Sequence, residues 1–181
     1  MDYDKIDEIH SDTIETLHYL GSFSRIQYKK RCDTWPGQLF IGDIYTSRNY
    51  FLLRALNIDT VINVTDDSDV PEFVDRLNYF QLHVDDNEVD DDTLLSTMQE
   101  TEILEKIRDG LYLGNVLVHC HAGVSRSATV VLCYIMVYEK QTFESAVAMI
   151  RASRDKVFNY GTNFVFQKTI AHYAKGLAGD P

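Results

Sequence analysis

The chain has few cysteines and no long apolar segment. Its 181 residues include only three cysteines, which cannot all pair with one another, and no signal peptide is recognisable, so a disulfide-stapled secreted protein is not expected. No apolar run reaches the roughly 20 residues of a membrane-spanning helix. Asp2 after Met1 and the ending Asp180-Pro181 predict neither a myristoyl nor a prenyl anchor. These absences predict a cytoplasmic or nuclear protein, or one found in both compartments.

Cations are also scarce. The sequence has 17 Lys and Arg against 28 Asp and Glu, which gives a formal net charge of −11. Such an excess of negative charge repels nucleic acids and anionic membranes, so neither is expected as a partner. It favours partners with basic surfaces. Sites for small anions remain possible, because salt screens distant surface charges.

The composition predicts one main domain with a short extension at each end. A chain of 181 residues with 45% hydrophobic content can bury a single sizeable core. We expect an N-terminal helical extension over residues 1–34, a main domain over 35–176 and a tail over 177–181. A helix near 3–20 would carry a rough apolar stripe that fills the core, docks a partner or mediates a homodimer.

Short apolar strands alternate with helical segments through the main domain. Strands are expected near 38–41, 60–64, 79–84 and 115–119, and helices near 47–56, 93–109, 127–140, 142–153 and 162–175. This alternation predicts an α/β fold with a central, mostly parallel sheet flanked by helices. Ligands usually bind at the carboxyl edge of such a sheet.

A nine-residue segment joins the last predicted strand to a long apolar helix. It reads His119-Cys120-His121-Ala122-Gly123-Val124-Ser125-Arg126-Ser127. In a strand-to-helix turn, converging backbone N–H groups and the helix dipole favour an oxyanion or a thiolate. Arg126 can bind two phosphoryl oxygens at once, and Gly123 lets the backbone approach an anion without a Cβ in the way. The segment therefore predicts a phosphate-binding site with Cys120 as nucleophile.

The same segment resembles the His-Cys-x5-Arg-Ser/Thr signature loop of cysteine-dependent protein phosphatases. Its Ala-Gly-x-Ser-Arg-Ser-Ala-Thr interior is similar to the dual-specificity branch, and the resemblance covers roughly residues 36 to 173. It implies a protein-tyrosine-phosphatase-like fold of the dual-specificity type. It also implies hydrolysis of phosphotyrosine, phosphoserine and phosphothreonine in proteins through a cysteinyl-phosphate intermediate, without a metal or cofactor. No kinase-binding domain is recognisable before residue 35, so a small, atypical member is expected.

The resemblance also implies a role for each residue of the loop. Cys120 attacks the phosphoryl group, Arg126 holds its equatorial oxygens, and Ser127 helps to release the thiolate in the second step. The intervening residues bind the substrate: His121, Ala122, Gly123, Val124 and Ser125. His119 is expected to orient the loop and to tune the Cys120 thiol through hydrogen bonds. Asn63 is expected to lie beside the loop.

Expulsion of the leaving oxygen requires a proton donor. The predicted strand 79–84 is followed by Asp85-Asp86-Asn87-Glu88, which is similar to the Val-x-Asp-Asn pattern of the family's acid segment. That resemblance identifies Asp86 as the general acid, with Asp85 as the alternative. The acids at 90–92 are expected to form a solvated turn, with Asp92 as the N-cap of the next helix.

Arg154 and the two remaining cysteines lie outside these motifs. Arg154 ends a predicted helix, where a cation complements the helix dipole, and the resemblance suggests that it also contacts a second phosphate. Neither Cys32 nor Cys133 lies in a reactive context. A disulfide between one of them and oxidised Cys120 remains open, because sequence distance does not determine thiol spacing.

Two functions from other classes also remain open. His119 and His121 would point the same way on a strand, as two ligands of a metal hydrolase do. Against this, Cys120 already begins the turn and no acidic motif completes a metal site. The second possibility is a phosphoprotein-binding module that keeps the anion cradle but turns over poorly.

The substrate class follows in part from the loop. It contains no Lys, whereas inositol-lipid phosphatases typically place basic residues there, and it lacks the Asn-Arg-Thr ending of RNA triphosphatases. Phosphorylated proteins are therefore the expected partners. Residues 158–164 depart from the family's Pro-Asn-x-Gly-Phe pattern, which leaves one side of the substrate site undefined.

Overall fold

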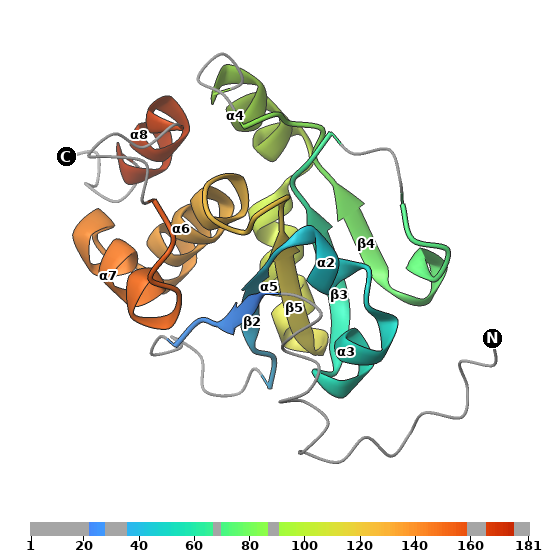
Figure 1. The fold of residues 1–181 in the computed structure, drawn as a ribbon. Helices are drawn as coiled ribbons and strands as arrows, with labels where there is room; N and C mark the ends of the chain where they lie inside the picture. Colours follow the sequence, from blue (N-terminus) through green and yellow to red (C-terminus); the bar gives the residue numbers. More distant parts are fainter. Residues whose placement is uncertain (1–21, 28–35, 67–69, 87–90, 159–165, 176–181) are drawn as a thin grey trace.

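The centre of the computed structural model is a five-stranded sheet (Figure 1). The structure describes residues 22–27, 36–66, 70–86, 91–158 and 166–175. The strands are β1 (Phe23–Arg25), β2 (Leu39–Gly42), β3 (Ile58–Asn63), β4 (Asn78–Gln81) and β5 (Asn115–His119), arranged in the order β1-β2-β5-β3-β4. β1 pairs antiparallel with β2, and all other pairs are parallel. The prediction of a mostly parallel sheet is thereby confirmed.

Helices cover both faces of the sheet. They are α2 (Ile44–Ser47), α3 (Tyr50–Ala55), α4 (Asp91–Glu100), α5 (Ile103–Leu113), α6 (Arg126–Glu139), α7 (Phe143–Ser153) and α8 (Gln167–Lys175), with a short 3-10 turn η3 (Val74–Arg76) before β4. Leu39 and Ile41 face a large core that includes α5 and α6, whereas Phe40 between them joins a smaller core with Leu53 of α3. This period of two is that of a strand buried on both faces.

β5 occupies the middle of the sheet. Its register places His119 beside Gly42 of β2 and beside Asn63 of β3. All three residues end their strands, so the chain leaves β2, β3 and β5 at one edge. The nine-residue segment therefore begins at the carboxyl edge of the sheet, as expected.

The helices expected at 47–56 and 93–109 both differ from the prediction. The first corresponds to α3, which starts after Asn49, whose side chain accepts a hydrogen bond from Leu52 N; a break at Arg48 and Asn49 separates it from α2, which was not expected. The helix expected at 93–109 is divided between α4 and α5 at Glu102, which adopts a left-handed conformation with φ of 50°. No Gly or Pro marks this second break, so the composition gave no signal of it.

Other differences concern the ends of the chain. β1 was not expected, because residues 23–25 fall in the N-terminal extension over 1–34, for which only a helix was predicted. The helix expected at 162–175 begins at Gln167, and 162–165 lie outside the described residues. The predicted helix at 3–20 and Cys32 also lie outside them.

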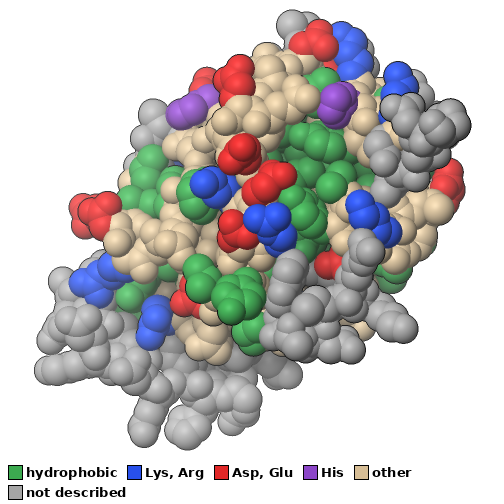
Figure 2. Space-filling model, turned by 180° about the vertical axis from the view of Figure 1, so that it is seen from behind, with side chains coloured by type: hydrophobic (Ala, Val, Ile, Leu, Met, Phe, Trp, Pro, Cys, Tyr) green, Lys and Arg blue, Asp and Glu red, His purple; other side chains and the backbone are tan. Residues whose placement is uncertain are grey.

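The surface opposite the view of Figure 1 carries charges of both signs. Acidic and basic side chains are intermixed there around an apolar area, without a continuous basic surface (Figure 2). Within the part of the chain that the structure describes, no helix has the length and apolar character needed to cross a bilayer.

Candidate active site

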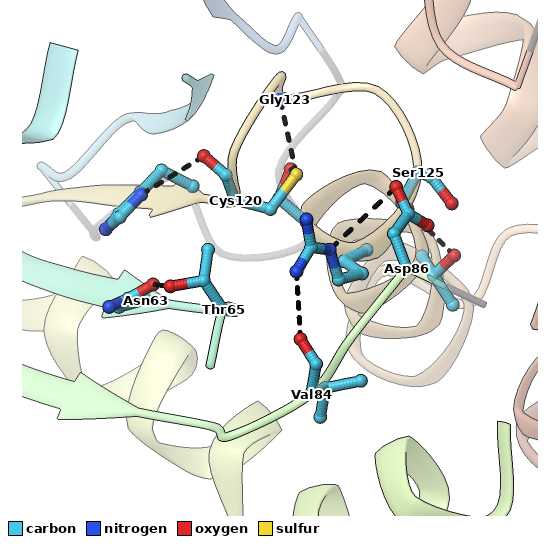
Figure 3. Close-up of polar contacts among 11 residues, drawn as sticks. Asn63, Thr65, Val84, Asp86, Cys120, Gly123 and Ser125 are labelled. Carbon is cyan, nitrogen blue, oxygen red and sulfur yellow. Dashed lines mark hydrogen bonds and ion pairs between the residues drawn. The ribbon is translucent and has the colours of Figure 1, made fainter. Parts of the chain in front are cut away.

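Cys120 leaves the central strand β5 and is buried in the loop that leads into α6. Cys120 is 1% exposed and belongs to the large core. α6 begins at Arg126 and is buried along most of its length. Residues 119–127, which run from the end of β5 into the first residues of α6, are called the catalytic loop below (Figure 3). A loop that ends in a core helix has little freedom to move.

Four successive carbonyl groups of the catalytic loop are held from outside. The oxygen of His121 accepts a hydrogen bond from Ile44 N at 3.1 Å, and that of Val124 accepts one from Phe158 N at 3.1 Å. The Arg154 guanidinium donates to the two carbonyl oxygens between them, from Nε to Gly123 O at 2.7 Å and from Nη2 to Ala122 O at 3.1 Å. Because C=O and N–H point in opposite directions in a trans peptide, the following N–H groups turn inward.

The Cys120 sulfur accepts two hydrogen bonds inside this loop. Gly123 N donates to Sγ at 3.2 Å, and the Ser127 hydroxyl donates to Sγ at 3.3 Å. Both donors, together with the N-terminus of α6, stabilise negative charge on the sulfur. The structure thus brings Cys120, Gly123 and Ser127 together, and the Ser127 hydroxyl lies where it can donate to a thiolate.

Gly123 is required by the shape of the loop. Its φ is +68°, a conformation that residues with a Cβ adopt at a cost. A Cβ built there would also lie 2.5 Å from the carbonyl oxygen of Gly42 and 2.9 Å from Nη2 of Arg154. The backbone of the loop thus packs directly against the end of β2.

Arg126 links the catalytic loop to the segment that carries Asp86. Its Nη1 donates to Val84 O at 2.9 Å, and its Nε lies 3.9 Å from Asp86 Oδ2, within charge-pair range but beyond a hydrogen bond (Figure 3). Nε is buried without a hydrogen-bond partner among the described residues. A buried, unpaired donor of this kind is suited to an anionic ligand that is bound only part of the time. Asp85 stays the alternative acid.

His119 is buried at the end of β5. Its Nδ1 lies 3.4 Å from the carbonyl oxygen of Cys120, and its Nε2 has no hydrogen-bond partner among the described residues. Burial lowers the pKa of His119 to about 4, so its imidazole is neutral near pH 7. His119 therefore contacts the backbone of the nucleophile rather than its sulfur.

Asn63 supports the edge of the sheet next to His119. Its Nδ2 donates to the Tyr79 hydroxyl at 2.9 Å, and its Oδ1 accepts from the Thr65 hydroxyl at 2.8 Å. These bonds tie β3 to β4 and to the residues that follow β3. Asn63 thus lies beside the loop through its strand, as expected.

Arg154 has a structural role that its position at a helix end did not predict. Its side chain turns away from α7 to the catalytic loop, and the residue is 5% exposed. Burial lowers the pKa of its guanidinium, although Asp43 and Cys120 oppose this effect. Contact of Arg154 with a second phosphate stays a prediction.

Sequence reasoning missed Asp43 and Phe158. Asp43 follows β2 and accepts hydrogen bonds from Ser22 N and from Thr46 N, each at 2.8 Å, which fixes the start of α2 against the loop. The Asp-x-x-Thr spacing of an N-cap could have revealed Asp43. Phe158 belongs to the segment 158–164, which was noted only for its departure from the family's pattern, so its bond to Val124 O was not predicted.

Two predictions in the acidic stretch were wrong. Asp91 is buried, at 3% exposure, instead of lying in a solvated turn. Its carboxylate accepts hydrogen bonds at the start of α8, 77 and 78 residues further along the chain. Asp92 is not an N-cap, because α4 already begins at Asp91, and it forms an exposed ion pair with Lys168 at 2.7 Å. Residues 87–90 lie outside the described part.

The two imidazoles of the proposed metal site lie in different environments. His119 is 2% exposed, whereas His121 is exposed. Across the described ranges, no group of three or more His, Cys, Asp or Glu residues is placed to hold a metal ion. Cys133 is fully buried, and burial raises the pKa of its thiol, which makes it a poor nucleophile.

Comparison with known proteins identifies a catalytic-domain family. The family described as dual specificity phosphatase, catalytic domain, matches residues 39–175. Dual specificity protein phosphatase 13B of Mus musculus is 34% identical over 157 residues, which cover 78% of this chain and 77% of that protein. Dual specificity protein phosphatase 4 of Homo sapiens is 32% identical over 138 residues, 75% of this chain but 32% of that longer protein.

Solved structures are similar over most of the chain. A mouse putative dual specificity phosphatase complexed with zinc tungstate has a TM-score of 0.66 and 26% identity, covering 86% of this chain and 87% of that one. Human DUSP28 has a TM-score of 0.66 and 21% identity, and the match covers 87% of this chain and 95% of that one. At this identity the similarity supports the fold alone.

Proposed function

The chain belongs to the dual-specificity phosphatase family, and from this premise we propose that Cys120 is its nucleophile, Arg126 its phosphate-binding cation and Asp86 its general acid. It is a protein phosphatase that acts on phosphotyrosine and on phosphoserine or phosphothreonine. The observation that carries the assignment is the Cys120 sulfur, which accepts hydrogen bonds from Gly123 N and the Ser127 hydroxyl.

In the first step the phosphate ester is transferred to sulfur. Inward N–H groups of the catalytic loop and Arg126 bind the non-bridging oxygens, with the unpaired Nε of Arg126 available for one of them. The Cys120 thiolate attacks phosphorus, and the bond to the ester oxygen breaks. Asp86 gives its proton to that oxygen, so the substrate leaves as a neutral alcohol or phenol.

In the second step water hydrolyses the cysteinyl-phosphate. Asp86, now ionised, takes a proton from the attacking water while the phosphorus–sulfur bond breaks. The departing thiolate regains its hydrogen bond from the Ser127 hydroxyl, 3.3 Å away in the free protein. Inorganic phosphate and the thiolate are the products, and no metal or cofactor is consumed.

The tungstate of the mouse structure is consistent with this mechanism. That protein is complexed with zinc tungstate, and tungstate is a tetrahedral oxyanion like phosphate. The residues that would bind such an anion here are those of the catalytic loop, whose four carbonyl groups from His121 to Val124 are bonded from outside. This part of the loop thus turns backbone donors rather than carbonyl acceptors toward an oxyanion.

Several properties of the whole protein extend this proposal. Residues 35–176 form the catalytic domain, and phosphorylated proteins with basic flanks are its preferred substrates, given the net charge of −11. A cytoplasmic or nuclear location, or both, stays a prediction. A homodimer through residues 1–34 stays a prediction, because most of that segment lies outside the described residues.

The decisive experiment compares wild type with Cys120→Ser on an aryl phosphate, with excess EDTA and separately with vanadate. We expect activity that resists EDTA, is inhibited by vanadate and falls by about 10⁴-fold or more without the thiol. Activity that EDTA abolishes and that survives the substitution would instead support a metal site at His119 and His121. A folded wild-type protein that binds phosphopeptide without turnover would support the binding module.

A further inference from the structure

Asp91 is a buried carboxylate that the proposed chemistry does not use. Its Oδ2 accepts a hydrogen bond from Lys168 N at 2.7 Å, and its Oδ1 accepts from Thr169 N at 2.9 Å and from the Thr169 hydroxyl at 2.7 Å. The same hydroxyl lies 3.0 Å from Asp91 O. Burial of a carboxylate is costly unless it is fully hydrogen-bonded, and Asp91 meets that condition.

These contacts cap one helix with the first residue of another. α8 begins at Gln167, so the two backbone donors belong to its first turn, where N–H groups lack partners within the helix and the dipole favours an anion. A cap usually comes from the residue just before the helix. Here it comes from 77 residues away, and it holds α4 and α8 side by side (Figure 1).

Asp91 also follows the proposed general acid closely. Asp86 and Asp91 are five residues apart, so the chain between them spans at most about 18 Å even when fully extended. On the other side of Asp86, Val84 O accepts a hydrogen bond from Arg126 at 2.9 Å. Asp86 thus lies in the chain between two anchored points: Val84, bonded to the first residue of α6, and Asp91, bonded to α8, which packs against α6; residues 87–90 lie outside the described part of the chain.

We propose that Asp91, together with Thr169, is a positioning residue for the general acid. Its bonds to α8 fix the end of the chain segment that carries Asp86, and thereby hold that carboxyl within reach of the leaving oxygen. The C-terminal helix thus takes part in the acid step without contacting the substrate. The inference rests on the proposed function, because it requires Asp86 to be the acid.

The test compares two substrates that differ in their need for an acid. A phosphoserine peptide expels a poor leaving group, whereas para-nitrophenyl phosphate expels a good one that departs without much help. We expect Asp91→Asn to lower kcat for the peptide by about 10- to 100-fold and kcat for the aryl phosphate by less than about 3-fold. KM for the peptide should stay within about 2-fold of wild type, since the anion cradle is intact.

Matched variants separate positioning from loss of structure. Thr169→Val removes only the hydroxyl and should show a weaker form of the same selectivity, which Thr169→Ser should restore. Lys168→Ala keeps the backbone donor but removes the exposed contact with Asp92, and should behave like wild type. If Asp91→Asn does not fold, the Thr169 pair gives the result. Equal losses on both substrates would overturn the proposal.

A double variant links the effect to the acid itself. Once Asp86 is replaced, no acid remains to be positioned, so Asp86→Asn with Asp91→Asn should be about as slow on the peptide as Asp86→Asn alone. Multiplicative losses would overturn the proposal. If Asp86→Asn alone shows no preference for the good leaving group, the acid assignment fails and the inference with it. If it does but Asp91→Asn does not, only the inference fails.

Discussion

The catalytic loop and the segment that carries the acid meet at Arg126 but are held in different ways. In the loop, every carbonyl from His121 to Val124 is bonded from outside, and the nucleophile is buried. In residues 82–86, here called the acid segment, Leu82 and Val84 are buried, whereas the side chain of Asp86 is 37% exposed. The loop that carries the proposed nucleophile is thus bonded at four successive residues, whereas the proposed acid lies partly exposed beside Arg126.

This difference fits the two chemical tasks. The thiolate and the anion cradle must have their geometry before the substrate arrives, because preorganised donors cost no rearrangement during the reaction. The acid serves leaving groups as different as phenols and alcohols, which differ in bulk beyond the ester oxygen and in how much they need a proton. Substitutions in the loop should therefore cost stability as well as rate, and those at the acid should cost rate alone.

The largest loss of stability is expected from Gly123→Ala. The new methyl group would have to share space with the end of β2 while its residue stays at a positive φ. We expect the free energy of unfolding to fall by about 3 kcal/mol or more, and kcat by about 10²-fold. Urea denaturation and steady-state kinetics would measure both. Val124→Ala, at a half-buried neighbour, is the control, and an equally stable Gly123→Ala protein would contradict the described loop.

His119 should make the free energy of unfolding depend on pH, with a loss of up to about 3 kcal/mol in acid. Burial lowers the pKa of His119 to about 4 from 6.5. Between pH 6.5 and 4, His119 is protonated in the unfolded chain but stays neutral in the folded protein. The contribution of His119 to the free energy of unfolding is therefore fully present above pH 6.5 and is lost as the pH falls toward 4. His119→Gln should remove this part of the slope in urea denaturation from pH 7 to 4.

The control for this slope is a core substitution that leaves the imidazole in place. Val118→Ala should lower stability by a similar amount at every pH, because it creates a cavity and changes no titrating group. An unchanged slope in His119→Gln would show that other groups cause the acid sensitivity of the fold.

A smaller loss, about 2 kcal/mol, is expected from Arg154→Lys. An ammonium group cannot reproduce the two parallel hydrogen bonds to Gly123 O and Ala122 O. The released loop should lower kcat by about 10-fold. Arg151→Lys, which alters one 3.3 Å bond to Phe158 O, is the matched control. A rise in KM confined to doubly phosphorylated peptides would instead support contact with a second phosphate.

The smallest change in stability is expected from Asp86→Asn. Its 3.9 Å pair with Arg126 is partly exposed, so its loss should change the free energy of unfolding by less than about 1 kcal/mol. The same substitution should slow phosphopeptide turnover by roughly 10²- to 10⁴-fold. Thermal unfolding and kinetics on one preparation would test both. A large loss of stability in Asp86→Asn would contradict this prediction, because it would show that the acid segment stabilises the fold as the catalytic loop does.

The sequence predicted the parts of the molecule that depend on local patterns. Strand alternation placed β5 and its neighbours, and the motif from His119 to Ser127 located the catalytic loop because its function requires adjacent residues. Asp91 was misassigned because its partners lie 77 and 78 residues away, and a run of acids looks solvated until such partners are known. The interruption at Glu102 and the inward turn of Arg154 likewise depend on tertiary contacts.

The burial of α6 has a consequence for how the enzyme fails on heating. Its side chains fill the large core, to which Cys120 in the preceding loop also belongs, so the proposed nucleophile should be lost only when that core melts. The acid depends on contacts that can loosen earlier. When one sample is heated, its activity on a phosphoserine peptide should therefore be lost at a lower temperature than its activity on para-nitrophenyl phosphate.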